Sequence, residues 1–182
     1  MKGTSFYSVK GGAGCTTVAA AFALLETRQH PRVTLKAKDY SDACAVLGLP
    51  MFPAGNSTQK VSHRLTLEPW GAPPDDIPTV YDYGLVGGNE EMPGARVFCV
   101  LRPCYLHLRR FQLSSIPATG IVLVDEPGRT LSRQDVEEVC GVPVVAQLCI
   151  DAAVARAIDS GLLATRVPQS LARSLSALGS AS

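Results

Sequence analysis

Short apolar runs alternate along this chain with longer stretches of helical spacing. The apolar runs predict strands at residues 3–9, 32–37, 61–67, 79–82, 95–101, 120–124 and 142–148. The stretches between them predict helices at residues 16–27, 40–49, 105–113, 132–139, 152–160 and 168–178. A regular alternation of strands and helices is typical of a parallel α/β sheet.

The connections between these elements are rich in proline and glycine. Residues 51–59, 69–78 and 84–94 are predicted to be loops, the last of them flexible. The chain shows no internal repeat, and 182 residues suit one core. We therefore expect a single domain over residues 1–178 and a flexible end at 179–182.

A glycine-rich segment separates the first strand from the first helix and has the layout of a phosphate-binding loop. Gly11, Gly12 and Gly14 would let backbone N–H groups converge on a phosphate, and the following helix would point its N-terminus at that anion. Thr16 stands where such loops place a hydroxyl on Mg²⁺. The alternative is a glycine-rich turn that binds nothing.

Cysteine occupies the position at which a phosphate-binding loop carries lysine. The Cys15 thiol is neutral or anionic near pH 7 and supplies no fixed positive charge. The loop is thus suited to holding an anion but lacks one charge for stabilising phosphoryl transfer. Cys15 is read either as an inert small residue or as an oxidation-sensitive thiol, because a helix N-terminus lowers a thiol pKa.

The segment from Lys10 to Thr17, Lys-Gly-Gly-Ala-Gly-Cys-Thr-Thr, resembles the deviant Walker A motif KGGxGK(S/T) of the ParA/MinD ATPases. The resemblance implies an α/β fold with a mostly parallel central sheet flanked by helices, a shortened P-loop NTPase of the ParA/MinD (SIMIBI) type. It also implies that Lys10 is catalytic and reaches a partner's nucleotide across a dimer interface. The residues implied to hold ATP are Lys10, Gly11, Gly12, Ala13, Gly14, Cys15, Thr16 and Thr17.

Three aspartates match further positions of the same family. Asp39 corresponds to an acid that orients attacking water, although an aspartate before a helix is equally read as an N-cap. Asp82 ends an apolar strand in the manner of a Walker B motif and would hold Mg²⁺ together with Thr16, the alternative being a turn aspartate. Asp125 stands where the family has an adenine-contacting asparagine, so either the base preference shifts towards guanine or no base binds.

Four departures from the family pattern weaken the expected hydrolysis. They are Cys15 for lysine, Ala37 for the first acid, Tyr83 for a small switch residue and Asp125 for asparagine. The resemblance then implies a degenerate member, possible relatives being the TadZ/CpaE type, that acts in positioning, partitioning or assembly through dimers or filaments. The alternatives are a slow partitioning ATPase that relies on Lys10 and an interaction module that needs no nucleotide.

Charge and residue composition limit the classes of partner that we expect this protein to bind. The net charge of +1 gives no strong attraction to nucleic acid or anionic lipid, so the arginines at 102, 109, 110, 166 and 173 support non-specific DNA binding only weakly. Leu171, Leu175 and Leu178 share one helix face, which favours core packing over membrane binding. The six cysteines lack metal-ligand spacing and indicate reduced thiols in a cytoplasmic protein.

Overall fold

The computed structural model describes residues 3–51, 57–72, 76–88 and 90–179. The strands are β1 (Gly3–Ser8), β2 (Val33–Ala37), β3 (Gln59–Lys60), β4 (Leu65–Pro69), β5 (Thr79–Leu85), β6 (Arg96–Leu101), β7 (Gly120–Asp125) and β8 (Val144–Cys149). The helices are α1 (Cys15–Glu26), α2 (Tyr40–Leu47), α3 (Tyr105–Leu113), α4 (Arg133–Cys140), α5 (Ala152–Asp159) and α6 (Gln169–Gly179).

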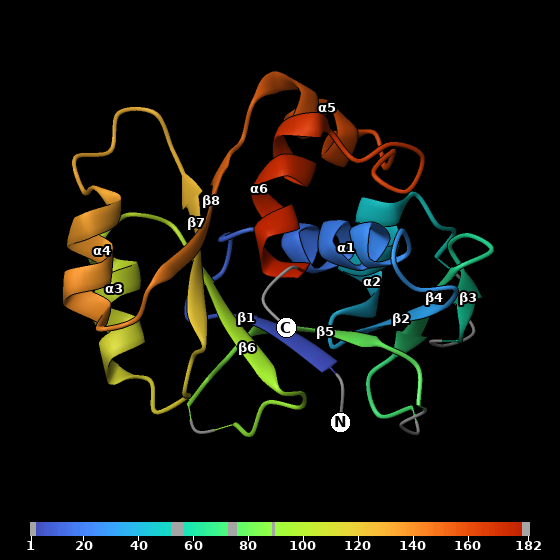
Figure 1. Cartoon of the computed structure of the whole chain (residues 1–182), viewed down its shortest axis with the longest axis horizontal. Coiled ribbons are helices and arrows are strands. Elements are labelled where there is room, and N and C mark those ends of the chain that lie inside the picture. Colours follow the sequence, from blue (N-terminus) through green and yellow to red (C-terminus); the bar gives the residue numbers. More distant parts are fainter. Residues whose placement is uncertain (1–2, 52–56, 73–75, 89, 180–182) are drawn as a thin grey trace.

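These strands form one sheet in the order β3-β4-β2-β5-β1-β6-β7-β8 (Figure 1). Only β3 runs antiparallel to its neighbour β4; the remaining pairs are parallel. The carboxyl ends of the parallel strands therefore meet at one edge, with β1 in the middle of the sheet. Ligands of such folds bind at that edge.

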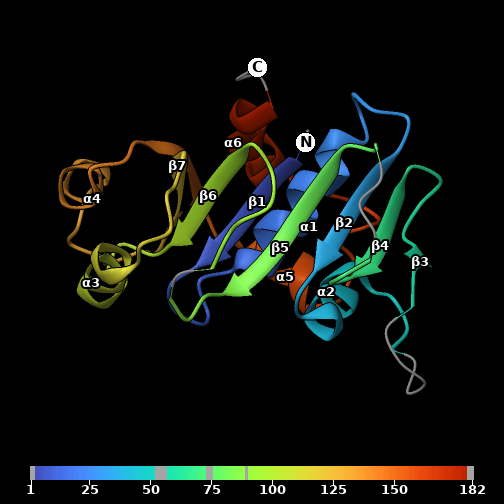
Figure 2. The same ribbon diagram turned by 90° about the horizontal axis from the view of Figure 1, so that it is seen from below.

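Alternate side chains along each central strand enter two different cores. Phe6 points into the core shared with α1, α2, α5 and α6, whereas its neighbour Tyr7 points into the core shared with α3 and α4. The two groups of helices lie apart in Figure 2, with α3 and α4 together beside β7. This period of two is what places both faces of β1 in the interior.

The C-terminal helix α6 is part of the first core. Leu171, Leu175 and Leu178 are all buried, and the helix packs against β8 and α1. The prediction of core packing rather than membrane binding is confirmed for this face. Among the described residues, we find no helix of the length and apolarity needed to span a membrane.

The strand predicted at residues 61–67 is confirmed only in its second half, because β4 starts at Leu65 and a separate short strand, β3, ends at Lys60. Ser62 accepts hydrogen bonds from the N–H groups of Arg64 and Leu65, at 3.2 and 3.0 Å, and so turns the chain between β3 and β4. A serine hydroxyl competes with strand pairing in this way.

Most other bounds shift by one or two residues, and two of the differences alter a predicted loop or tail. The strand predicted at 79–82 continues to Leu85, so the following loop starts later, and Gly84 adopts φ +66° where the pairing register with β1 shifts. Gly179 ends α6 instead of starting a flexible tail. The predicted tail residues 180–182, and the loop residues 52–56, 73–75 and 89, lie outside the described residues.

Candidate functional site

The glycine loop joins β1 to α1 at the carboxyl edge of the sheet. Gly12 and Gly14 adopt φ +77° and +91°, a conformation that disfavours any residue with a Cβ, and a Cβ at either position would meet no atom within 4 Å. Gly14 is the N-cap of α1 and, being glycine, has no side chain with which to cap that end. The first N–H groups of α1 are therefore left for a ligand, and the helix dipole favours an anion there.

A cavity of about 380 Å³ opens over this loop. The residues that line it include Ser8 and each residue from Lys10 to Thr17, with Asp39, Asp42, Ala45 and Val46 from α2 and its N-cap, and Gly84 and Leu85 from β5. The structure thus gathers the predicted loop residues and Asp39 around one space. The α2 residues and Leu85 were not predicted from the sequence; an acid in the first turn after an N-cap was the available signal for Asp42.

Asp82 lies beneath the loop and is 1% exposed. Its Oδ1 accepts a hydrogen bond from the Gly84 N–H at 3.2 Å, and its Oδ2 has no hydrogen-bond partner among the described residues. Burial raises the pKa of this carboxyl to about 6, against the opposing influence of Thr16, Cys15 and the Gly84 N–H. A buried carboxylate oxygen without a partner, beside a threonine hydroxyl, fits a cation such as Mg²⁺.

The metal would need other ligands as well. Within the described ranges, no group of three or more His, Cys, Asp and Glu side chains is arranged to hold a metal ion. Mg²⁺ commonly takes one or two carboxylates together with phosphate oxygens and water. The pair of Thr16 and Asp82 therefore suits a cation that arrives with a phosphate ligand.

Cys15 is buried, with 7% of its surface exposed. Burial, followed by the nearby Asp82 carboxylate, raises the pKa of its thiol well above the ordinary value. The expectation that the helix N-terminus lowers this pKa was wrong, because desolvation and a neighbouring anion outweigh the helix dipole. The reading of Cys15 as an inert residue is favoured over that of a reactive thiol.

Asp39 combines the two alternatives drawn from the sequence. Its Oδ1 accepts hydrogen bonds from the Asp42 N–H at 3.1 Å and the Ser41 hydroxyl at 2.8 Å, which makes it the N-cap of α2. These bonds lower its pKa, the backbone bond first. The same residue lines the loop cavity, so a capping carboxylate also faces the candidate ligand space.

Lys10 and Asp125 occupy different parts of the carboxyl edge. Lys10 is half-buried, lines the loop cavity, and accepts a bond from the Ser8 hydroxyl on its carbonyl at 2.9 Å. Asp125 ends β7, two strands from β1, and accepts a hydrogen bond from the Gln147 amide at 3.1 Å. It does not line the loop cavity, so its predicted role in base recognition stays a prediction.

Tyr83, one of the departures from the family pattern, packs away from Asp82 on the other side of β5. The centres of the Tyr83 and Trp70 rings lie 4.8 Å apart, with the rings edge-to-face, and the Lys38 ammonium lies 4.3 Å from the centre of the Tyr83 ring. Tyr83 itself is buried in the second core.

The five arginines noted in the sequence do not form one patch. Arg102 forms an ion pair with Glu126, whereas Arg166 and Arg173 line a cavity of about 930 Å³ between α5 and α6, together with Arg156. The positive charge is thus divided between two places, so neither of them concentrates all five arginines.

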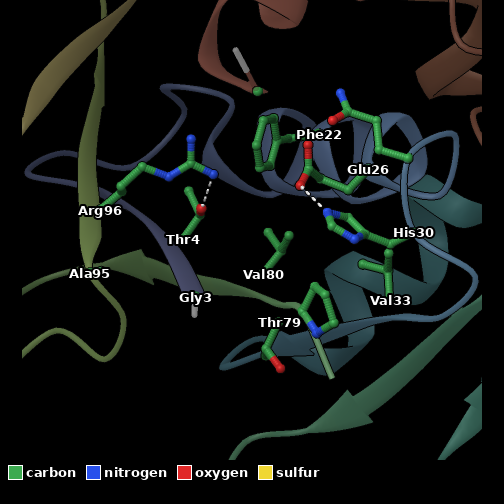
Figure 3. A pocket seen from close by; sticks show the side chains of 13 residues that line it. Gly3, Thr4, Phe22, Glu26, His30, Val33, Thr79, Val80, Ala95 and Arg96 are labelled. Carbon is green, nitrogen blue, oxygen red and sulfur yellow. Dashed lines mark hydrogen bonds and ion pairs between the residues drawn. The ribbon is translucent and has the colours of Figure 1, made fainter. Parts of the chain in front are cut away.

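Another cavity, of about 450 Å³, lies at the opposite edge of the sheet (Figure 3). It is formed by the amino ends of β1, β5 and β6 and by the end of α1. Arg96 donates to the Thr4 hydroxyl at 2.9 Å on one side, and Glu26 and His30 approach to 3.6 Å on the other. This cavity and the glycine loop therefore lie at opposite ends of the strands.

No family model matches this sequence, and no curated protein matches it. Solved structures do match. The MinD cell division protein of Aquifex aeolicus superposes with a TM-score of 0.76 at 14% identity, covering 100% of this chain and 98% of that one. A ParA family ATPase of Chlorobium tepidum superposes with a TM-score of 0.71 at 18% identity, covering 97% of each chain. The septum site-determining protein MinD of Pyrococcus horikoshii, complexed with Mg-ADP, superposes with a TM-score of 0.72 at 16% identity, covering 97% of this chain and 93% of that one.

The similarity therefore lies in the fold, and it extends over the whole sheet and its helices. It agrees with the motif resemblance of the glycine loop, which the structure places between β1 and α1. This 182-residue chain therefore has a ParA/MinD-like fold.

Proposed function

We propose that this protein is a degenerate ParA/MinD-like nucleotide-binding protein, which acts in positioning, partitioning or assembly with little or no ATP hydrolysis. The observation that carries the proposal is Cys15, a neutral buried thiol at the lysine position of an otherwise complete glycine loop. The loop keeps the backbone geometry for binding phosphate and lacks the charge for its transfer.

The residues of the site divide the work of binding. The loop N–H groups and the N-terminus of α1 would hold the phosphates, and Thr16 with Asp82 would hold Mg²⁺. Bound Mg²⁺ would neutralise phosphate charge. It would also stabilise the buried Asp82 carboxylate, whose Oδ2 has no partner in the described part of the chain.

Loss of one preorganised positive charge costs about 3–4 kcal/mol of transition-state stabilisation, or at least a hundredfold in rate. Thr16 and Thr17, which follow Cys15, are neutral and do not replace that charge. Binding depends mainly on backbone donors and so survives this loss better than catalysis.

A second candidate function is slow ATP hydrolysis that relies on Lys10. It is favoured by the position of Lys10, which lines the loop cavity and carries the cationic side chain nearest in sequence to Cys15. An ammonium that reaches the phosphates, in its own subunit or in a partner's, would restore part of the missing charge.

Self-assembly is supported by apolar surface beside the loop. Leu85 and Leu113 are 55% and 70% exposed, and both line a hollow of about 320 Å³ with Val86 and Arg110. Exposed apolar side chains that cluster around a hollow are typical of an interaction surface. We infer a homodimer or a higher assembly that uses this face.

The test is thermal unfolding of nucleotide-stripped protein with Mg-ATP, Mg-ADP or Mg-GTP. A ligand at 100 times its Kd stabilises by about 2.7 kcal/mol, which raises Tm by several degrees. We expect this rise for wild type with Mg-ATP or Mg-ADP, and no measurable phosphate release.

Two variants separate the candidates. Cys15→Lys restores the missing charge and should raise nucleotide affinity and bring phosphate release above the wild-type background. Lys10→Ala should abolish wild-type turnover if the second candidate holds. An unchanged Tm at millimolar concentrations of all three nucleotides would contradict the nucleotide-binding proposal and leave an interaction module that needs no nucleotide.

A further inference from the structure

A cysteine and a histidine form a pair at the start of α3, at the carboxyl end of β6. Cys104 is the N-cap of α3, and its Sγ lies 3.0 Å from Nδ1 of His107. The spacing of three residues places both on the same side of the first turn. Cys104 is partly exposed to solvent, whereas His107 is 2% exposed.

The buried His107 ring stays neutral at physiological pH. Burial lowers its pKa to about 4, assisted by the positive charges of Lys10, Arg102 and Arg110, and Glu126 only partly opposes them. A neutral ring carries one N–H, and a proton on Nδ1 would be donated to a Cys104 thiolate. Nε2 is buried with no hydrogen-bond partner in the described ranges, so the contact with sulfur is the one hydrogen bond found for this ring.

The charges that surround the pair come from several elements. Arg102 and Arg129 both bind Glu126, the latter through its Nε at 2.8 Å. The pKa of Arg129 is raised, first by its bond to Glu126 and also by the nearby Cys104 sulfur.

Lys10 from the glycine loop and Arg110 from α3 add positive charge near His107, and Glu126 is the acid that faces the pair. Cys104 therefore lies in a field of net positive charge at the N-terminus of α3. The same field disfavours a bound metal cation.

Cys104 lines neither the loop cavity nor the cavity of Figure 3, so it has no pocket there for an organic substrate. A partly exposed thiol with a hydrogen-bond donor and cations around it suits instead a small oxidant that needs no pocket. Cys149 is more exposed; it pairs with Asp125 across the sheet and precedes Asp151 by two residues.

We propose that Cys104 is a peroxide-reactive thiol and the site of reversible oxidation in this protein. The thiolate attacks one oxygen of hydrogen peroxide; the S–O bond forms as the O–O bond breaks. Sulfur loses two electrons and becomes the sulfenic acid, and the departing hydroxide takes a proton from solvent and leaves as water. His107 donates to the thiolate, and Arg102 and Arg129 stabilise its charge.

The experiment measures how much sulfenic acid forms at each cysteine of the folded protein. The protein is exposed briefly to hydrogen peroxide, the sulfenic acid is trapped with dimedone, and the labelled cysteines are quantified by mass spectrometry. A parallel pulse of iodoacetamide between pH 5.5 and 8.5 reports thiolate reactivity. We expect Cys104 to react at least tenfold faster than the more exposed Cys149. Equal rates, or faster labelling of Cys149, would overturn the proposal.

Arg129→Gln tests the electrostatic part without disturbing the interior, because Arg129 is exposed and its partner Glu126 keeps Arg102. Arg133→Gln is the matched control, since Arg133 also forms an exposed pair with a glutamate, Glu137. We expect a severalfold slower reaction of Cys104 in the first variant and no change in the second. Equal effects of the two variants, or none, would show that the surrounding charge does not activate this thiol. Nucleotide is absent throughout, so the result is independent of the proposed nucleotide-binding function.

Discussion

The Cys15 thiol lies against the Asp82 carboxylate beneath the glycine loop, and both side chains are buried. A lysine at this position would bring a positive charge close to that carboxylate. The thiol brings none, and the pKa of Asp82 is accordingly raised to about 6 by burial. In the absence of a cation, Asp82 is therefore a source of instability near neutral pH.

Asp82→Asn should stabilise the metal-free protein at pH 8. The folded protein holds a proton on Asp82 up to about pH 6, whereas the unfolded chain releases it near pH 3.8. The contribution of Asp82 to the free energy of unfolding is thus favourable below pH 3.8 and is lost as the pH rises through 6. The lost amount is about 2–3 kcal/mol.

Urea unfolding of both proteins between pH 3.5 and 8 measures this difference. The two curves of unfolding free energy against pH should converge at low pH. The contributions of the other carboxylates cancel in the difference because both proteins contain them. Addition of Mg²⁺ with nucleotide should stabilise wild type more than the variant, because the variant lacks the carboxylate that would hold the metal. A variant that is less stable than wild type at pH 8 would contradict the assigned pKa.

Asp39→Ala should cost about 1 kcal/mol of stability, because α2 loses its N-cap. Asp39→Asn keeps a capping oxygen and removes only the charge, so we expect near-wild-type stability. Chemical denaturation measures the cap, and nucleotide affinity or turnover measures the role in the cavity. If Asp39→Asn changes neither affinity nor turnover, the residue is an N-cap alone.

Gly14→Ala should destabilise the protein by about 1–2 kcal/mol, because a Cβ is strained at φ +91°. The space around the position is empty, so the cost is conformational and not steric. Gly11→Ala is the control; Gly11 is exposed, lies in equally open space and lacks a positive φ. Differential scanning calorimetry of both variants should therefore show a loss only for Gly14→Ala.

Leu113→Asp should weaken self-association at least tenfold, because it places a charge in the apolar hollow beside Leu85. Leu162→Asp is matched in exposure, 54% against 70%, but lies by the α5–α6 cavity. Sedimentation velocity with and without Mg-ATP compares the two variants with wild type. A similar loss for Leu162→Asp would place the contact on the other face.

Most elements of the fold were predictable because burial has a local signature. The alternation of Phe6 with Tyr7 between two cores follows from the apolar run around them, and the helix at Tyr105–Leu113 was predicted with its observed bounds. The turn at Ser62 was missed because one serine hydroxyl redirects a run that otherwise alternates like a strand.

The sequence alone determined the glycine loop, its place between strand and helix and the absence of its lysine, since these depend on residues that are neighbours in the chain. Tertiary structure decided which distant groups meet there. The order β2-β5-β1 brings Asp39 to the loop and Asp82 beneath Cys15, and the order β1-β6-β7 sets Cys104 and His107 among charges from three segments. Burial and neighbouring charge then fix the pKa of each group, and both arise only when the sheet has formed.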